Sequence, residues 1–171
     1  MVKKLAEMNE LSFLYYQSPL GPLRIAGTDQ YISEISFIEQ ESNVAHSANS
    51  YPVLHKCVEE LIEYFNGERF SFEIPVKQEG TEFQRKVWAK LLDIPYGKTI
   101  SYMTLAKRLG DPNCIRAAAS SNGKNHVAII VPCHRVIGSN QSLVGYAGGL
   151  WRKKWLLDHE NKYANGLQTL F

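Results

Sequence analysis

The chain has 171 residues, 44% of them hydrophobic, with three cysteines and a formal net charge of +2. An odd number of cysteines without a C-x-x-C pair argues against a disulfide framework, so we expect a cytoplasmic protein. The sequence lacks an apolar run long enough to span a membrane, and no apolar stretch of the signal-peptide type follows Lys3 and Lys4.

Charge is unevenly distributed along the chain. Residues 1–77 contain 6 basic and 11 acidic residues, a net of −5, whereas residues 78–171 contain 13 basic and 6 acidic residues, a net of +7. A basic half suggests a surface that faces a polyanion, although two ordinary solvated faces would give the same balance. We place the domain boundary at this switch, with an N-terminal domain over 1–78 and a C-terminal domain over 79–171.

The first half is typical of strands followed by a helix. Apolar and aromatic runs separated by turn residues predict strands over 11–17, 23–26 and 31–37. Apolar residues at helical spacing predict a helix from Val53 to Phe65. Cys57 lies on its apolar stripe, which favours a buried structural thiol. Phe70, Phe72 and Ile74 alternate with polar residues, which predicts a further strand over 70–74 that ends at Pro75.

The second half is predicted to be mainly helical. Thr81 and Gln84 have the spacing of a capping box, which indicates the start of a helix. The expected buried face of that helix consists of Val87, Trp88, Leu91 and Leu92.

Two shorter helices should follow. Ser101 is a suitable N-cap for one that runs to Leu109, and Gly110 can end it. Asp111-Pro112 can begin another that runs to about Ser121. Two short helices joined by a glycine-containing turn predict a helix-turn-helix, although many such pairs are only packing units.

A cysteine stands at the end of an apolar run. The run Val127–Val131 leads to Cys133, which His134 and Arg135 follow, and neighbouring basic groups favour a reactive thiolate. The alternative is an inert buried thiol with solvent-facing neighbours. A histidine acting as a base needs a third group to hold it, and Glu160 is a candidate, unless it is simply a solvated residue at a helix end.

These residues resemble a known family. Pro132-Cys133-His134-Arg135-Val136 is similar to the active-site motif of the O6-alkylguanine-DNA alkyltransferases. The similarity extends from about Gly80 to Glu160 and is weaker in the first half. Further matching segments are Thr81-x-Phe83-Gln84, Ile94-Pro95-x-Gly97, Ser101-Tyr102, Arg116-Ala117-Ala118, Asn125, Tyr146–Leu150 and Trp155–Glu160.

The resemblance implies an α+β fold, with a ribonuclease-H-like N-terminal domain and a mainly helical C-terminal domain that carries the helix-turn-helix. It also implies a DNA-repair enzyme that acts once and needs no cofactor. Such a protein transfers an alkyl group from O6-alkylguanine, and from O4-alkylthymine, to its own Cys133. His134 would act as base through a water, Glu160 would orient His134, and Asn125 would be a hinge residue.

The resemblance further implies a monomer that binds duplex DNA through the minor groove and flips the damaged nucleotide out. The residues expected at the DNA are Arg116, Tyr102, Ala117, Ala118 and Ser101. The residues expected around the flipped guanine are Tyr146, Tyr102 and the backbone of Ala147 and Val136. Minor-groove binding suits lesions that occur in any sequence context.

Some family members hold zinc in the first domain. That half of this chain offers only Cys57, His46 and His55 as soft ligands, so we expect no metal. Three other functions compete with alkyl transfer. They are a non-catalytic lesion-binding relative, which would lack the cysteine, a transcriptional regulator that senses alkylation, and a cysteine hydrolase.

Overall fold

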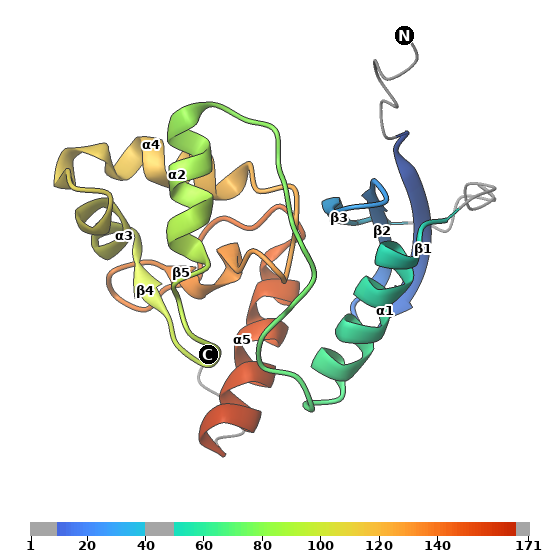
Figure 1. Ribbon diagram of the computed structural model, residues 1–171. Helices are drawn as coiled ribbons and strands as arrows, with labels where there is room; N and C mark the ends of the chain where they lie inside the picture. Colours follow the sequence, from blue (N-terminus) through green and yellow to red (C-terminus); the bar gives the residue numbers. More distant parts are fainter. Residues whose placement is uncertain (1–9, 40–49, 167–171) are drawn as a thin grey trace, which may run out of the picture. The chain divides into compact units, whose positions relative to one another are not determined.

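The computed structural model describes residues 10–39 and 50–166. The chain divides into two compact units, residues 1–77 and residues 78–171 (Figure 1). The expectation about a signal peptide and the possible ligand His46 lie outside the described residues.

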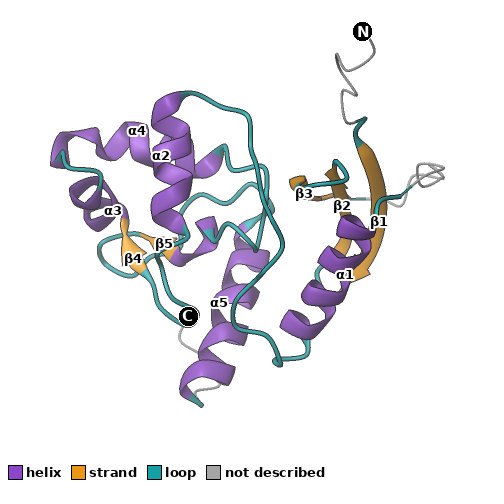
Figure 2. Ribbon diagram, viewed as in Figure 1, coloured by secondary structure: helices purple, strands orange, loops and turns teal. Residues whose placement is uncertain are grey.

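The first unit is a small sheet covered by one helix. Strands β1 (Ser12–Ser18), β2 (Gly21–Gly27) and β3 (Ile32–Phe37) pair antiparallel in that order, and α1 (Pro52–Phe65) packs against all three (Figure 2). The three strands and the helix confirm the predictions for this half. Cys57 is fully buried, as its place on the apolar stripe predicted. The core residues of this unit include Leu14, Leu23, Ile25, Ile35, Leu54 and Leu61.

The strand predicted over 70–74 was wrong. Within the described residues this segment pairs with no strand, and only Val76 forms an isolated parallel bridge with Ile32. The reason is a side chain far away in sequence. The buried carboxylate of Glu60 accepts the backbone N–H groups of Glu73 and Ile74, at 3.1 and 3.3 Å, so these amides need no neighbouring strand.

The second unit is mainly helical. Its described elements are α2 (Glu82–Leu91), β4 (Ile100–Ser101), α3 (Tyr102–Arg108), α4 (Ile115–Gly123), β5 (Val136–Ile137) and α5 (Leu150–Asn165). Helices α2, α3 and α4 pack against one another, and β4 pairs with β5 in parallel (Figure 1). Helices α3 and α4 form the predicted helix pair.

Local sequence signals set the helix starts. Thr81 and Gln84 form the predicted capping box at the start of α2, and Ser101 caps α3 by accepting the Thr104 N–H at 3.0 Å. Leu92 was predicted to be buried but is 57% exposed, because α2 ends one residue before it.

Two further boundaries differ from the predictions. The helix expected from Pro112 to about Ser121 is a 3₁₀ turn over Pro112–Cys114 followed by α4, which ends at Gly123. Helix α5 continues to Asn165, so Glu160 lies inside the helix rather than at its end. The fold class is otherwise as expected, with a small mixed first unit and a helical second one. Within 10–39 and 50–166, no helix combines the length and apolar character that crossing a membrane requires.

Candidate active site

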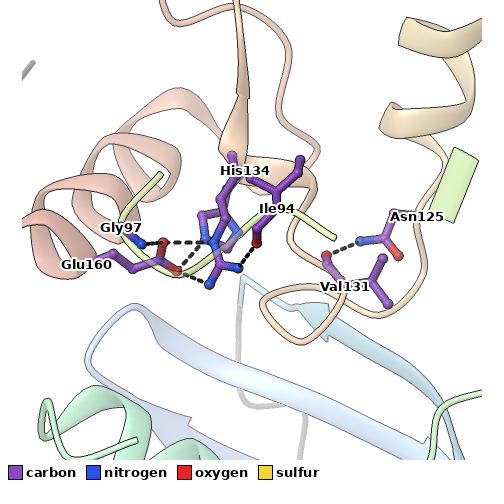
Figure 3. A network of polar contacts seen from close by, with 7 residues as sticks. Ile94, Gly97, Asn125, Val131, His134 and Glu160 are labelled. Carbon is purple, nitrogen blue, oxygen red and sulfur yellow. Dashed lines mark hydrogen bonds and ion pairs between the residues drawn. The ribbon is translucent and has the colours of Figure 1, made fainter. Parts of the chain in front are cut away.

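The segment that carries Cys133 is held by the half-buried side-chain amide of Asn125. Asn125 Nδ2 donates to the carbonyl of Val131 at 2.8 Å (Figure 3). It also donates to the carbonyl of Val127 at 3.2 Å, and Asn125 Oδ1 accepts the Val127 N–H at 3.1 Å. Gln78 adds a second tie, since its Nε2 donates to Asn125 Oδ1 at 2.8 Å. The apolar run before the cysteine is therefore fixed by side-chain amides, although it forms no regular strand.

The other end of this segment is fixed by the short parallel sheet. Cys133, His134 and Arg135 form a 3₁₀ turn that passes directly into β5. There Val136 pairs with Ile100 and Ile137 pairs with Ser101, the residue that caps α3. This pairing brings the cysteine motif beside the start of the predicted helix-turn-helix.

His134 and Glu160 form a buried pair. Their side chains are 0% and 1% exposed, and His134 Nε2 lies 2.7 Å from Glu160 Oε1 (Figure 3). Gly97 also donates its backbone N–H to Glu160 Oε2, at 3.3 Å. These positions rule out the solvated readings of His134 and Glu160.

Arg135 completes the network around the carboxylate. Its Nε and Nη2 donate to the two oxygens of Glu160, each at 2.9 Å, and its Nη1 donates to the Ile94 carbonyl at 2.7 Å. Burial alone would raise the pKa of Glu160, but His134 and Arg135 outweigh it and hold that pKa well below its usual value. Glu160 is therefore ionised at neutral pH.

An ionised Glu160 decides the tautomer of His134. The carboxylate can only accept, so Nε2 carries the hydrogen and Nδ1 of the neutral ring is left unprotonated. Burial lowers the pKa of His134 and so keeps the ring neutral, although Glu160 acts in the opposite direction. Nδ1 is buried and has no hydrogen-bond partner in the described part of the chain. It is thus available to take a proton.

Cys133 is a buried thiol, 7% exposed. Burial raises its pKa, while the Asn125 amide and then the Lys153 ammonium act in the opposite direction. A buried thiol of this kind needs a base to become nucleophilic. Burial, and then the charge of Cys133, raise the pKa of both Tyr102 and Tyr146.

A cavity of about 520 Å³ lies beside these tyrosines. Four of the predicted site residues line it: Tyr102, Arg116, Tyr146 and Ala147. Its other lining residues are Ile115, Ala119, Asn122, Gly123, Val144 and Gly145. This volume falls in the range typical of small-molecule sites.

Four other residues that were predicted at DNA or around the base do not line this cavity. Ser101 serves as the cap of α3, and Val136 is fully buried, with its carbonyl bound by Lys153 Nζ at 2.7 Å. Ala117 is exposed on α4, but Ala118 is fully buried. Of these two alanines, only Ala117 therefore presents its side chain to solvent on α4, because successive residues of a helix point in different directions. The placement of these alanines at DNA stays a prediction.

Sequence reasoning gave no site role to three polar residues that the structure places here: Lys153, Asn122 and Gln78. It considered Arg135 only as a basic neighbour of Cys133 and not as a partner of Glu160. One of the three had a usable signal. Lys153 precedes the buried Leu156, Leu157 and Glu160 by three, four and seven positions, so a charged residue occupies the core face of α5. Gln78 had no such signal, because its partner lies 47 residues away.

Comparison with known families gives a consistent result for both units. Residues 12–78 match the family described as "6-O-methylguanine DNA methyltransferase, ribonuclease-like domain". Residues 82–162 match that described as "6-O-methylguanine DNA methyltransferase, DNA binding domain".

Individual proteins agree with this match. A methylated-DNA–protein-cysteine methyltransferase of Mycobacterium bovis is 42% identical over 156 residues, covering 90% of this chain and 94% of that protein. A Mycobacterium tuberculosis O6-methylguanine methyltransferase structure matches with a TM-score of 0.81 and 37% identity, covering 92% of this chain and 97% of the other. Another structure, of Mycobacterium tuberculosis OGT in complex with DNA, matches with a TM-score of 0.80 and 40% identity, covering 88% and 93%.

Proposed function

The chain belongs to the 6-O-methylguanine DNA methyltransferase family, and from this membership we propose that it repairs DNA by direct reversal. It takes an alkyl group from O6 of guanine, or from O4 of thymine, onto Cys133. A bond forms between Cys133 Sγ and the alkyl carbon, and the bond from that carbon to the base oxygen breaks. The resulting thioether is not hydrolysed, so each molecule acts once.

The observation that carries this proposal is the buried His134–Glu160 pair next to a buried thiol. The thiol proton of Cys133 passes through a bridging water to His134 Nδ1, the unprotonated nitrogen. Glu160 holds the ring in this tautomer and stabilises the imidazolium that forms. The base leaves as an anion and takes up one proton, which the imidazolium of His134 returns through water, so the overall proton balance is closed.

We further propose that the substrate is duplex DNA bound through its minor groove by the second unit. The relative whose structure was determined in complex with DNA supports DNA as the binding partner. Arg116 is exposed on α4 at the cavity and suits the stack position that a flipped nucleotide vacates. Tyr102 contacts the flipped base. Ser101, which caps α3, and Ala117, which is exposed on α4, are further candidates for DNA contact.

The cavity receives the flipped base. Tyr146 and the backbone of Ala147 form part of its wall, and amide donors near O6 would stabilise the leaving guanine. We propose a monomer that works in the cytoplasm, since three free cysteines, Cys57, Cys114 and Cys133, suit a reducing compartment.

Intact mass spectrometry tests the proposal. After incubation with a duplex that contains O6-methylguanine, the full chain should gain one methyl group and then stop, and peptide mapping should place it on Cys133. Cys133→Ala should abolish the gain and retain DNA affinity, whereas the matched Cys114→Ala should react normally. Sustained turnover, or a methyl group on Cys57 or Cys114, would contradict the proposal.

Binding without any mass gain would instead favour a non-catalytic lesion-binding protein. The presence of Cys133 argues against that alternative. Continuous hydrolysis of a chromogenic ester would favour a cysteine hydrolase.

A further inference from the structure

Lys153 is a buried cation whose role the proposed reaction does not assign. It lies on α5, and its side chain is fully buried. Within the described residues it forms no ion pair with a carboxylate. A buried ammonium is costly unless its hydrogen-bonding capacity is used, so its partners indicate why it is there.

Those partners are three backbone carbonyls. Lys153 Nζ donates to Val136 O at 2.7 Å, to Val144 O at 2.9 Å and to Gly145 O at 3.4 Å. An ammonium has three hydrogens, and this arrangement can use all of them. Val136 directly follows the cysteine turn, while Val144 and Gly145 line the cavity. One side chain therefore joins the cysteine segment to a wall of the cavity.

The wall segment has mostly local support of its own. Residues 138–149 are irregular apart from turns, and hydrogen bonds such as Gly138 N–H to Ser142 O and Gly149 N–H to Tyr146 O span only a few residues. Tyr102 also donates its hydroxyl to Val144 O, at 3.1 Å, and Lys153 Nζ lies 5.8 Å from the centre of its ring. Lys153 thus joins the wall segment to Val136. It also lies beside Tyr102, the tyrosine proposed to contact the base.

The ammonium is also coupled to the thiol. The charge of Lys153 lowers the pKa of Cys133, against the larger effect of burial. In return, Cys133 raises the pKa of Lys153, which burial lowers to about 8. A positive charge near the sulfur favours the thiolate, the form that attacks an alkyl carbon.

We propose that Lys153 is a positioning residue for alkyl transfer. Its ammonium holds the wall segment Val144–Gly145 against Val136 so that the base pocket is formed beside Cys133, and its charge favours the Cys133 thiolate. This inference rests on the proposed function, but two of its measurements do not depend on transfer.

The first experiment measures single-turnover transfer from free O6-benzylguanine to the full chain, as a function of substrate concentration. In Lys153→Met, the half-saturating concentration should rise and the saturating rate should fall, each by about tenfold, because charge-assisted hydrogen bonds and thiolate stabilisation are both lost. The matched control is Lys154→Met, since Lys154 is half-exposed and pairs with Asp158. Its two constants should stay within about twofold of wild type.

The second experiment needs no alkyl transfer. Hydrogen exchange over residues 138–149 should become faster in Lys153→Met and remain unchanged in Lys154→Met. The pH at which Cys133 becomes half-reactive with iodoacetamide should rise in Lys153→Met and return towards wild type in Lys153→Arg, which keeps the charge. Thermal melts of each variant confirm folding, and Lys153→Arg serves if the methionine variant does not fold.

The outcomes separate the two ideas. A wild-type chain that never gains a benzyl group contradicts the proposed function alone. Exchange and thiol titration that are unchanged in both Lys153 variants overturn the role of Lys153, whatever the transfer rates show. Equal losses in Lys153→Met and Lys154→Met also overturn it, because then the effect is not specific to the buried position.

Discussion

Glu160 and His134 lie 26 residues apart in the chain, yet His134 Nε2 and Glu160 Oε1 are 2.7 Å apart, and both side chains are buried. The carboxylate keeps its charge there because Arg135 binds both of its oxygens. Because the ionised Glu160 accepts the hydrogen of His134 Nε2, Nδ1 is the ring nitrogen that can take up a proton.

Replacing Glu160 by Gln should both destabilise the protein and slow transfer. The change leaves Arg135 as a buried charge without its partner, which costs about 3–5 kcal/mol in the free energy of unfolding. Transfer from O6-methylguanine should fall by about tenfold or more, because the imidazolium loses its counter-charge. Urea unfolding at pH 7 and single-turnover rates measure the two effects.

The control for this change is Glu82→Gln. Glu82 forms a pair with Lys86 on the surface of α2, and its side chain is 79% exposed. Its replacement should cost less than about 1 kcal/mol and leave the rate unchanged. Equal effects of the two substitutions would show that the buried network has no special role.

The stability of the protein should decrease as the pH falls below about 6.5, in part because of His134. The unfolded chain binds a proton at this histidine near its usual pKa, whereas burial lowers the pKa in the folded state. Below that usual value the unfolded chain therefore holds more protons, and the free energy of unfolding declines with falling pH. Glu160 acts in the same direction at lower pH, since its pKa is lowered on folding.

Urea unfolding at pH 7.5 and pH 5 measures this dependence. His134→Gln should show a smaller difference between the two pH values than wild type. His55→Gln, at an exposed position on α1, should retain the wild-type difference. If His134→Gln shows the same difference in free energy of unfolding between the two pH values as wild type, His134 does not contribute to the pH dependence.

Arg116→Ala should slow repair of a duplex lesion without slowing the reaction of a free base. Unstacking a nucleotide costs a few kcal/mol, and each 1.4 kcal/mol is about tenfold in rate, so we expect a loss of about tenfold or more on duplex. Transfer from free O6-benzylguanine needs no flipping and should hardly change. Single-turnover rates on both substrates make the comparison.

Arg108→Ala is the matched control, because Arg108 is an exposed arginine at the end of α3 and does not line the cavity. It should not separate the two substrates. If Arg116→Ala slows both reactions equally, Arg116 supports the pocket or the fold, and its place in nucleotide flipping has to be given up.

DNA affinity should fall steeply with added salt, because residues 78–171 carry a net charge of +7. The logarithm of the association constant should decline linearly with the logarithm of salt concentration, by about 0.9 for each phosphate contact. Lys107→Ala, on α3, should reduce this slope by about one, and Lys56→Ala, on α1 of the first unit, should leave it unchanged. An affinity independent of salt would contradict phosphate-based binding.

Sequence alone was sufficient where the determining contacts are local. The start of α2 depends on hydrogen bonds between Thr81 and Gln84, three residues apart, and the start of α3 depends on Ser101 and Thr104 in the same way. Apolar spacing likewise predicted α1 and the burial of Cys57. These features need no knowledge of distant residues, because each is decided within one or two helical turns.

Family resemblance extended the sequence reading to the site, but the contacts themselves depend on tertiary structure. Neither the burial of His134 nor the contact of Arg135 with Glu160 follows from spacing, since adjacent residues could equally face solvent. The strand wrongly predicted over 70–74 has the same origin. Glu60 accepts the backbone N–H groups of Glu73 and Ile74, which lie 13 and 14 residues away in the sequence.

Lys153 shows the physical reason most clearly. Lysine is a residue type that is usually exposed. Here the carbonyls of Val136, Val144 and Gly145 offset the cost of burying its charge. Those carbonyls meet only after β5 has paired with β4 and α5 has docked. The chain therefore determines its helix starts and its cysteine motif locally, whereas the charges buried around Cys133 are decided by partners that only the completed fold brings within hydrogen-bond distance.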